Sequence, residues 1–255
     1  MGQELSKKII ANNKLEFVGG FEHKKHKNIN KEFNKVSEIQ SSNLIHSNPT
    51  PSIKLANVLI DFTTPQSTLK NIKIASLNKT AVVIGTTGIS SAQKNKIKIF
   101  SKKIPILMSS NMSLWVNFLF NLVSQTSSAL KETDYDIEIA ETHHKHKKDA
   151  PSGTALSLGD CAALGRKTSL NKSKILDRTK KLSSRKKGDI GFSVTRGGEI
   201  AGEHTVSFIG ENDRVDLVHK ANNRSIFVKG ALDAAIFLNK KKSGLYTMND
   251  LLFSK

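Results

Sequence analysis

Short apolar runs alternate with amphipathic segments between residues 56 and 108, and this alternation constrains the fold more than any other feature of the chain. Residues 56–62, 80–84 and 104–108 are almost continuously apolar, which is typical of parallel strands covered on both faces. The segments between them, 66–77 and 91–101, suit helices. We therefore expect an α/β domain with a Rossmann-like, doubly wound parallel sheet.

The pattern changes after residue 113. A long helix is predicted over 113–130, and it is followed by strands, several of them alternating in polarity, over 136–141, 191–196, 205–210 and 214–219. One helix, over 152–164, interrupts them, and another, over 224–239, precedes a short tail at 245–253. Strands in succession favour a second, α+β domain with a mostly antiparallel sheet. We place the first domain at residues 1–112 and 224–255 and the second at 113–223.

The N-terminal part is less regular. Residues 3–12 suit an amphipathic helix, residues 15–21 suit a strand, and residues 22–54 are polar enough for loops around a short helix. Trp115 and the nearby Phe residues are expected in the core.

A net charge of +18 makes a nucleic-acid-binding protein an alternative to an enzyme. However, the Lys residues are spread along the whole chain, aromatic residues amount to only 6%, and no nucleic-acid-binding motif is present. A solvated basic surface is therefore favoured, with no nucleic-acid partner, and such a surface would attract anionic cofactors and substrates.

The chain has one cysteine, Cys161, which excludes an intrachain disulfide and fits a reducing compartment. No apolar run approaches the length of a membrane span, and the first residues lack the apolar core of a signal peptide. We expect a cytoplasmic protein with no membrane partner. Cys161 lies in an apolar run and suits a small buried hydrophobic residue better than a nucleophile.

The segment Glu141-Thr-His-His-Lys-His-Lys-Lys-Asp-Ala-Pro-Ser-Gly-Thr-Ala155 concentrates the chemistry. It could be a solvated basic loop, a metal site, or an anion site with a proton donor. Its histidines are too close together on an extended loop for one ion, and no HExxH or CxxC frame is present. Ser152 can cap a helix whose first N–H groups would hold a carboxylate, which favours the anion site without settling the choice.

This segment resembles the signature of 4-hydroxy-tetrahydrodipicolinate reductases, also called dihydrodipicolinate reductases. The resemblance covers nearly the whole chain. Further blocks in the family's order are IDFTTP (60–65), VIGTTG (83–88), SSNMSLWVN (109–117), RGGEIAGEHTVSF (196–208), HKANNRSIFVKGAL (219–232) and SGLYTMNDLL (243–252). The resemblance implies NADH- or NADPH-dependent reduction of a cyclic dicarboxylate in lysine and diaminopimelate biosynthesis. It also implies a dinucleotide-binding first domain, and a second domain that binds substrate and forms a homotetramer.

The family's catalytic roles fall on two residues. His143 matches the proton donor, and Lys147 matches the residue that stabilises developing negative charge. His144 matches a substrate-binding position, and Gly153 and Thr154 match the pair that binds a substrate carboxylate.

The family's cofactor contacts fall on three loops and the N-terminus. Glu22 matches the acid that binds the adenosine ribose, while His23 stands where relatives often have Arg, so that NADH and NADPH both remain possible. The matching positions are Met1, Glu22, His23, Gly85, Thr86, Thr87, Ser109, Ser110, Asn111 and Met112.

The largest departure from the family is at the N-terminus. Family members begin with a short strand and a GxxGxMG turn, whereas this sequence begins Met1-Gly2-Gln3. We expect the first strand and the earlier glycines to be encoded upstream of Met1. An inactive relative that binds the acid but no dinucleotide is one alternative. An aspartate-dehydrogenase-like enzyme of the same architecture is another, against which the His/Lys segment argues.

Overall fold

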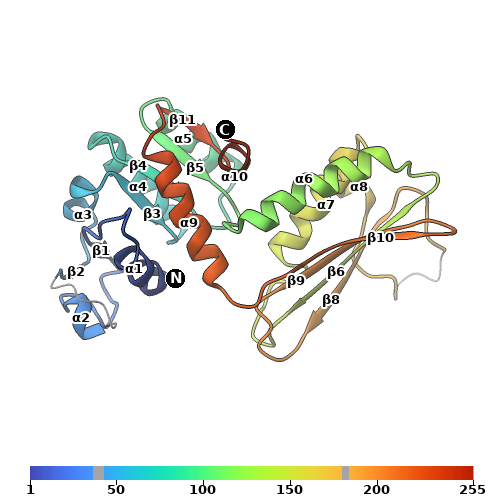
Figure 1. Ribbon diagram of the computed structural model, residues 1–255, viewed down its shortest axis with the longest axis horizontal. Coiled ribbons are helices and arrows are strands. Elements are labelled where there is room, and N and C mark those ends of the chain that lie inside the picture. Colours follow the sequence, from blue (N-terminus) through green and yellow to red (C-terminus); the bar gives the residue numbers. More distant parts are fainter. Residues whose placement is uncertain (37–42, 180–183, 255) are drawn as a thin grey trace. The chain divides into compact units, whose positions relative to one another are not determined.

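The computed structural model describes residues 1–36, 43–179 and 184–254, and these form two compact units (Figure 1). Unit 1 comprises Met1–Ser113 and Ser225–Lys255, and unit 2 comprises Leu114–Arg224. No helix in the described part of the chain is both long and apolar enough to cross a bilayer.

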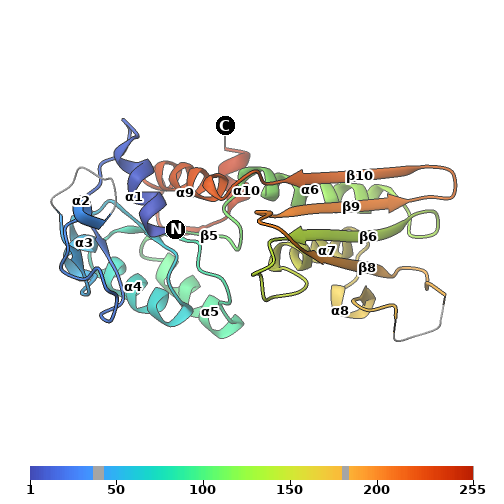
Figure 2. The same cartoon turned by 90° about the horizontal axis from the view of Figure 1, so that it is seen from below.

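The centre of unit 1 is a parallel sheet in the order β11-β5-β4-β3. Its strands are β3 (Val58–Asp61), β4 (Ala81–Ile84), β5 (Pro105–Met108) and β11 (Gly244–Tyr246). Helices α4 (Pro65–Leu77) and α5 (Ser91–Ser101) lie along one face, and α9 (Ser225–Leu238) packs on the other (Figure 2). The expected doubly wound α/β arrangement is confirmed, because near-continuous apolar strands need cover on both faces.

The helices of this sheet begin where the sequence provides a cap. The Thr64 hydroxyl accepts a hydrogen bond from the Ser67 N–H, and Pro65 occupies the first turn of α4, where its missing N–H costs nothing. Ser90 and Gln93 form a reciprocal capping box at the start of α5. These caps fix where the preceding loops end, and those loops follow β3 and β4.

The tail predicted at 245–253 is instead structured. Its first residues form β11 beside β5, and α10 (Met248–Leu252) follows. A strand of three residues is too short to give a pattern in the sequence, and only its partner β5 defines it.

The N-terminal part of unit 1 also differs from expectation. Helix α1 (Gly2–Ile10) forms as predicted, but the strand expected over 15–21 is reduced to β1 (Gly20–Phe21). β1 pairs in parallel with β2 (Ile45–His46) in a separate two-stranded sheet, with α2 (Phe33–Val36) and α3 (Thr50–Leu55) nearby in the sequence. Among the described residues, only these two positions of the predicted strand find a ladder partner.

Unit 2 is a five-stranded sheet in the order β10-β9-β6-β8-β7. The strands are β6 (Asp136–His143), β7 (Lys174–Ile175), β8 (Ile190–Arg196), β9 (Glu203–Ile209) and β10 (Arg214–Lys220). β9 runs antiparallel to β6 and β10, as expected, but β6 and β8 are parallel, so the sheet is mixed. The chain crosses from β6 to β8 through α7 (Gly153–Gly165) and α8 (Leu170–Ser173), and such a crossover returns the next strand in the same direction.

Helices α6 (Leu114–Ala129) and α7 pack together on one face of this sheet, while the other face is open to solvent (Figure 2). The covered face holds the core of the unit, which includes Ile137, Ile139, Leu158, Val206 and Phe208. Strand alternation puts Glu141 and His143 on this same face, because they follow Ile137 and Ile139 at intervals of two. The core therefore determines which way these two polar side chains point.

Candidate active site

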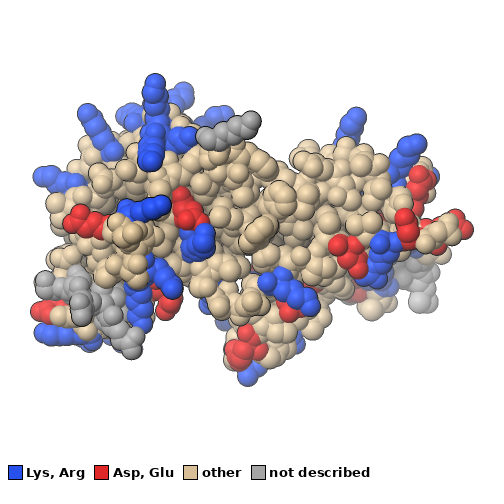
Figure 3. Space-filling model, viewed as in Figure 1, with Lys and Arg blue, Asp and Glu red and all other residues tan. Residues whose placement is uncertain are grey.

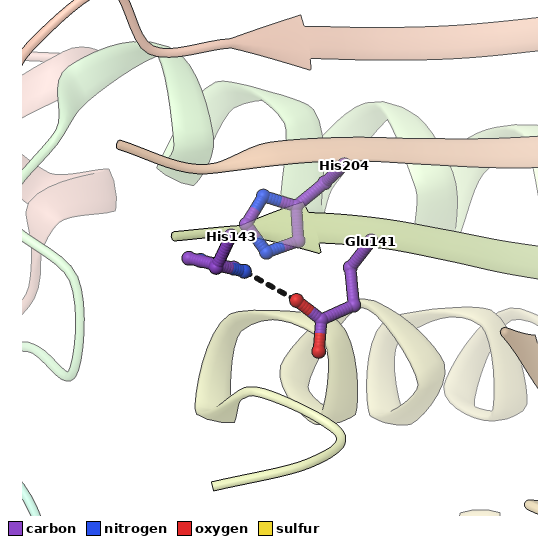
Figure 4. A group of neighbouring side chains, drawn as sticks. All are labelled: Glu141, His143 and His204. Atoms are coloured by element: carbon purple, nitrogen blue, oxygen red, sulfur yellow. Dashed lines mark hydrogen bonds and ion pairs between the residues drawn. The ribbon is translucent and has the colours of Figure 1, made fainter. Parts of the chain in front are cut away.

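Three buried side chains meet at the end of β6 (Figure 4). Glu141 and His143 come from β6, and His204 comes from β9, where it is paired with Glu141 across the ladder. The Nδ1 atom of His143 is hydrogen-bonded to Oε2 of Glu141, and the rings of His143 and His204 meet edge to face with centroids 5.1 Å apart.

Glu141 accepts hydrogen bonds through both oxygens. The Arg196 guanidinium donates to Oε1 at 2.8 Å and to Oε2 at 3.1 Å, and the Ser152 N–H donates to Oε1 at 2.8 Å. Burial alone would raise the pKa of Glu141, but these donors and His143 hold its pKa below the ordinary value. Glu141 is therefore a buried carboxylate that stays ionised.

His143 is under opposing influences. Burial lowers the pKa of its imidazole, the neighbouring Glu141 raises it, and Lys147 and Arg196 lower it again, so that the net direction is downward. A side chain on Gly202 would bring its Cβ within 2.9 Å of Nε2 of His143. Gly202 also has φ of +151°, which L side chains rarely adopt. Glycine at this position leaves the space beside Nε2 open.

His204 is buried as well. Burial, followed by the charge of His143, lowers the pKa of His204 to about 4, so its ring is neutral at physiological pH. Its Nε2 lies 3.2 Å from the Ser152 hydroxyl, and that hydroxyl also accepts the Ala155 N–H at the start of α7. Within the described residues, its Nδ1 has no hydrogen-bond partner.

The ligand atoms of Glu141, His143 and His204 all lie within 4.8 Å of one another, a spacing that a metal ion could bridge. Their existing partners argue against that use. Both Glu141 oxygens already accept hydrogen bonds from Arg196, whose fixed positive charge would oppose a cation at this point. The arrangement suits proton transfer better than metal binding.

Two loop residues beyond β6 make ion pairs or hydrogen bonds of their own. The Lys147 ammonium lies 2.8 Å and 3.0 Å from the two carboxylate oxygens of Asp149. Burial works against ionisation of Asp149, but Lys147 and the N–H of Gly153 lower its pKa. His144 contacts Arg224 through Nε2 at 3.2 Å.

Helix α7 begins beside this loop. Ser152 is its N-cap, and Gly153 and Thr154 are its first two residues. A Cβ added to Gly153 would meet nothing within 4 Å, so the helix start is accessible. N–H groups at a helix N-terminus favour an anion.

In unit 1, two of the predicted cofactor loops lie together. Residues 85–87 follow β4 and residues 109–112 follow β5, and the Ser109 N–H donates to the carbonyl of Ile84 at 3.1 Å. Because β4 and β5 are adjacent and parallel, both loops lie at the same edge of the sheet, where such folds bind ligands. Glu22 and His23 follow β1 in the separate small sheet, so strand pairing does not bring them to this edge.

Comparison with known proteins identifies the family. Residues 1–112 match the model for the dihydrodipicolinate reductase N-terminus, and residues 116–252 match the model for its C-terminus. The 4-hydroxy-tetrahydrodipicolinate reductase 1 of Mesorhizobium japonicum is 40% identical over 253 residues, which cover 99% of this chain and 93% of that protein. The corresponding reductase of Agrobacterium fabrum is 45% identical over 208 residues, 82% of this chain and 76% of that protein.

The chain belongs to the dihydrodipicolinate reductase family. It is an NAD(P)H-dependent oxidoreductase, as the resemblance of its sequence motifs implied. A solved structure titled dipicolinate-bound dihydrodipicolinate reductase from Paenisporosarcina sp. TG-14 has the same fold, with a TM-score of 0.72 at 23% identity over 97% of this chain and 94% of that chain.

The predicted cofactor residues of unit 1 differ in exposure, since Glu22 is exposed whereas Thr86 and Met112 are buried. The Glu22 carboxylate is exposed, and a carboxylate can accept hydrogen bonds from ribose hydroxyls. The loop after β4 is held in place by a buried network around Asp61. Its carboxylate accepts hydrogen bonds from Thr63, Thr68, Asn71 and Thr86.

Replacing Asp61 with Asn is expected to destabilise unit 1 by about 2 kcal/mol, because an amide nitrogen would face donors that now meet a carboxylate oxygen. Denaturant unfolding measures this loss, and NADPH binding should weaken as the Thr86 loop loses its anchor. Asp233→Asn, on the exposed Lys229–Asp233 pair of the same unit, is the matched control. Equal stability of the two variants would show that the network does not hold the loop.

Two expectations about single residues have opposite outcomes. Cys161 is partly buried against the unit 2 core, and burial raises its pKa to about 11, which disfavours a nucleophilic thiolate, as expected. The prediction that Trp115 lies in the core is wrong, since it is 70% exposed on α6. The apolar composition of α6 did not reveal which of its faces meets the sheet.

Sequence reasoning did not assign a role in the site to Glu141, Arg196, Gly202 or His204. The available signal was the spacing of two between Glu141 and His143, which places them on one face of a strand. The proximity of Arg196 and His204 comes from the pairing of β8 and β9 with β6, which one sequence does not reveal.

Proposed function

We propose that this chain catalyses the NAD(P)H-dependent reduction of 4-hydroxy-tetrahydrodipicolinate to tetrahydrodipicolinate, a step of diaminopimelate and lysine biosynthesis. Membership of the family supports the reaction. The observation that carries the site assignment is the buried Glu141–His143 pair beside the N-terminus of α7, because it combines a proton donor with an anion site.

Unit 2 provides the substrate site in this proposal. One carboxylate of the substrate binds the N–H groups of Gly153 and Thr154, and His144 makes a further contact. Asp149 now lies against Gly153 and Lys147, so the substrate carboxylate would take over part of its hydrogen bonding. Lys147 then stabilises negative charge that develops on the substrate.

His143 supplies the proton. Its Nε2 is the ring nitrogen that does not face Glu141, and the missing side chain of Gly202 leaves this atom accessible. A bound dianion raises the pKa of a neighbouring imidazole, which counteracts the effect of burial. His143 is thereby protonated when substrate is present, and it donates that proton to the reduced ring.

Unit 1 binds the cofactor through Met1, Glu22, His23, Gly85, Thr86, Thr87, Ser109, Ser110, Asn111 and Met112. The bound nicotinamide supplies the hydride. Glu22 binds the adenosine ribose, while residues 85–87 and 109–112 hold the nicotinamide end. His23, with Lys24 and Lys25 beside it, is compatible with either NADH or NADPH.

The open face of the unit 2 sheet suits the homotetramer that we propose for this cytoplasmic enzyme. Its outward side chains are mostly small or β-branched, among them Ala140, Thr142, Ser193, Thr195 and Val218. Val218 is 50% exposed. Such a face packs well against a second sheet.

The alternative of a nucleic-acid-binding protein gains no support from the face shown in Figure 3. On the face shown in Figure 3, Lys and Arg side chains are spread over both units, with acidic side chains among them. We therefore do not favour this alternative.

The test of the proposed function follows NADPH absorbance at neutral pH while dihydrodipicolinate synthase generates the substrate from pyruvate and aspartate semialdehyde. Rapid oxidation that depends on the synthase is expected. Its absence, together with steeply salt-dependent binding to RNA or DNA, would favour the nucleic-acid alternative instead.

A further inference from the structure

We infer that Glu141 is the positioning residue of this active site, a buried carboxylate that fixes both the proton donor His143 and the start of the substrate-binding helix α7. The inference rests on the proposed role of His143. It adds Glu141 and its partner Arg196 to the residues on which the reaction depends.

The first part of the argument concerns the location of the protons on His143. An ionised carboxylate accepts hydrogen bonds and donates none. The ring nitrogen that faces Glu141, Nδ1, must therefore carry a hydrogen in both protonation states of the imidazole. The exchangeable proton is confined to Nε2, on the side where Gly202 leaves space. Glu141 thus selects the tautomer that can deliver a proton.

The second part concerns the helix start. Oε1 of Glu141 accepts the Ser152 N–H at 2.8 Å, and Ser152 is the N-cap of α7. The Ser152 hydroxyl in turn binds the Ala155 N–H and lies 3.2 Å from His204. The N–H groups of Gly153 and Thr154 follow directly. One carboxylate therefore sets the distance between the proton donor and the anion site.

The third part concerns Arg196, whose guanidinium stabilises the buried negative charge of Glu141. It contacts both Glu141 oxygens and also donates to the carbonyl of Asp149 at 2.7 Å. A bidentate guanidinium keeps Glu141 ionised, but its positive charge also offsets part of the negative potential that Glu141 exerts on His143. Glu141 and Arg196 therefore act on His143 in opposite directions.

Other charged or titratable groups near His143 have to be considered. They come from the loop after β6, from β9 and, beyond His204, from β10. These groups are Lys147, Asp149, His204 and His219. None of them contacts the Nδ1 atom, which faces Glu141. Substitutions of Glu141 and Arg196 therefore isolate the proposed effect.

The experiment titrates the His143 ring by NMR in the full chain without cofactor or substrate, with the signal assigned by its loss in His143→Asn. In Glu141→Gln, the pKa of His143 should fall by about one pH unit, because the imidazolium loses its counter-charge. In Arg196→Gln, the pKa of His143 should rise, because the positive charge of Arg196 is lost and no longer offsets the negative charge of Glu141. Opposite shifts are the distinguishing result, since a merely structural role would not produce them.

Either single variant leaves a buried charge without its partner and risks misfolding. The double variant Glu141→Gln/Arg196→Gln leaves none, and circular dichroism checks its fold. Its His143 pKa should lie below that of the unchanged protein, because the carboxylate contacts the ring directly and the guanidinium does not. Glu211→Gln, in the exposed turn between β9 and β10, is the matched control and should leave the pKa unchanged.

Activity provides the second readout. In Glu141→Gln, we expect kcat to fall about 10- to 100-fold and KM for the substrate to rise, because donor and anion site both lose their anchor. Activity requires protonated His143 and is therefore lost as pH rises through the pKa of His143. The pH at which activity falls should be lower in Glu141→Gln and higher in Arg196→Gln than in the unchanged protein. Unchanged or parallel shifts in the NMR titration would overturn the inference. Failure of NADPH oxidation in the unchanged protein would instead overturn the proposed function.

Discussion

Replacing His143 with Asn is expected to lower kcat by about 10²- to 10⁴-fold, the usual contribution of a general acid or base. Asparagine can still donate a hydrogen bond to Glu141, but it has no proton to transfer at neutral pH. KM should change much less, because the proposed carboxylate site at Gly153 and Thr154 is intact. Initial rates of NADPH oxidation over a range of substrate concentrations separate the two parameters.

His146→Asn is the matched control for this variant. His146 lies three residues further along the same loop, with a side chain that is 68% exposed. It makes a long contact to Glu199, and its ring centroid lies 6.2 Å from that of His144. It should retain nearly full activity. If the two variants lose activity equally, or if His143→Asn loses none, another group must supply the proton, and Lys147 would be examined next.

Replacing Gly230 with Ala is expected to destabilise unit 1 by about 3 kcal/mol through overpacking. A Cβ at this position of α9 would lie 1.7 Å from the carbonyl oxygen of Met112, a backbone atom that no rotamer change can move. Gly→Ala inside a helix usually raises the free energy of unfolding by up to about 1 kcal/mol. A decrease in Gly230→Ala would therefore report the close approach of α9 to the Met112 carbonyl. Thermal unfolding followed by circular dichroism measures it.

The same substitution should weaken cofactor binding, because Met112 ends the segment 109–112 that we assign to the nicotinamide. NADPH titration followed by fluorescence tests this effect. The matched control is Gly197→Ala in unit 2, where an added Cβ would meet nothing within 4 Å. A Gly230→Ala variant as stable as the control would contradict the close contact between α9 and this segment.

Much of the fold could be read from the sequence. The α/β architecture of unit 1 was predictable because its strands are apolar throughout and its helices carry caps such as Ser90. The family was recognisable from the His/Lys segment and the blocks around it. The roles of His143, Lys147 and the cofactor residues stay predictions, and the experiments above address them.

The parts that could not be predicted depend on pairing between distant segments. β11 has only three residues and exists as a strand because β5 lies beside it. The parallel pairing of β6 with β8 follows from the path through α7, which alternation of polarity does not encode. Trp115 lies in an apolar stretch, but it faces solvent.

The sequence by itself determined the α/β class, the family, and the local order of chemical groups, because periodicity, caps and a contiguous signature are local properties of the chain. The tertiary structure alone decided which groups surround His143. Glu141 was two residues away in the sequence, but Arg196, Gly202 and His204 are more than fifty residues distant and arrive there through β8 and β9. A proton donor is defined by the charges around it, and in this protein those charges come from strands that only folding brings together.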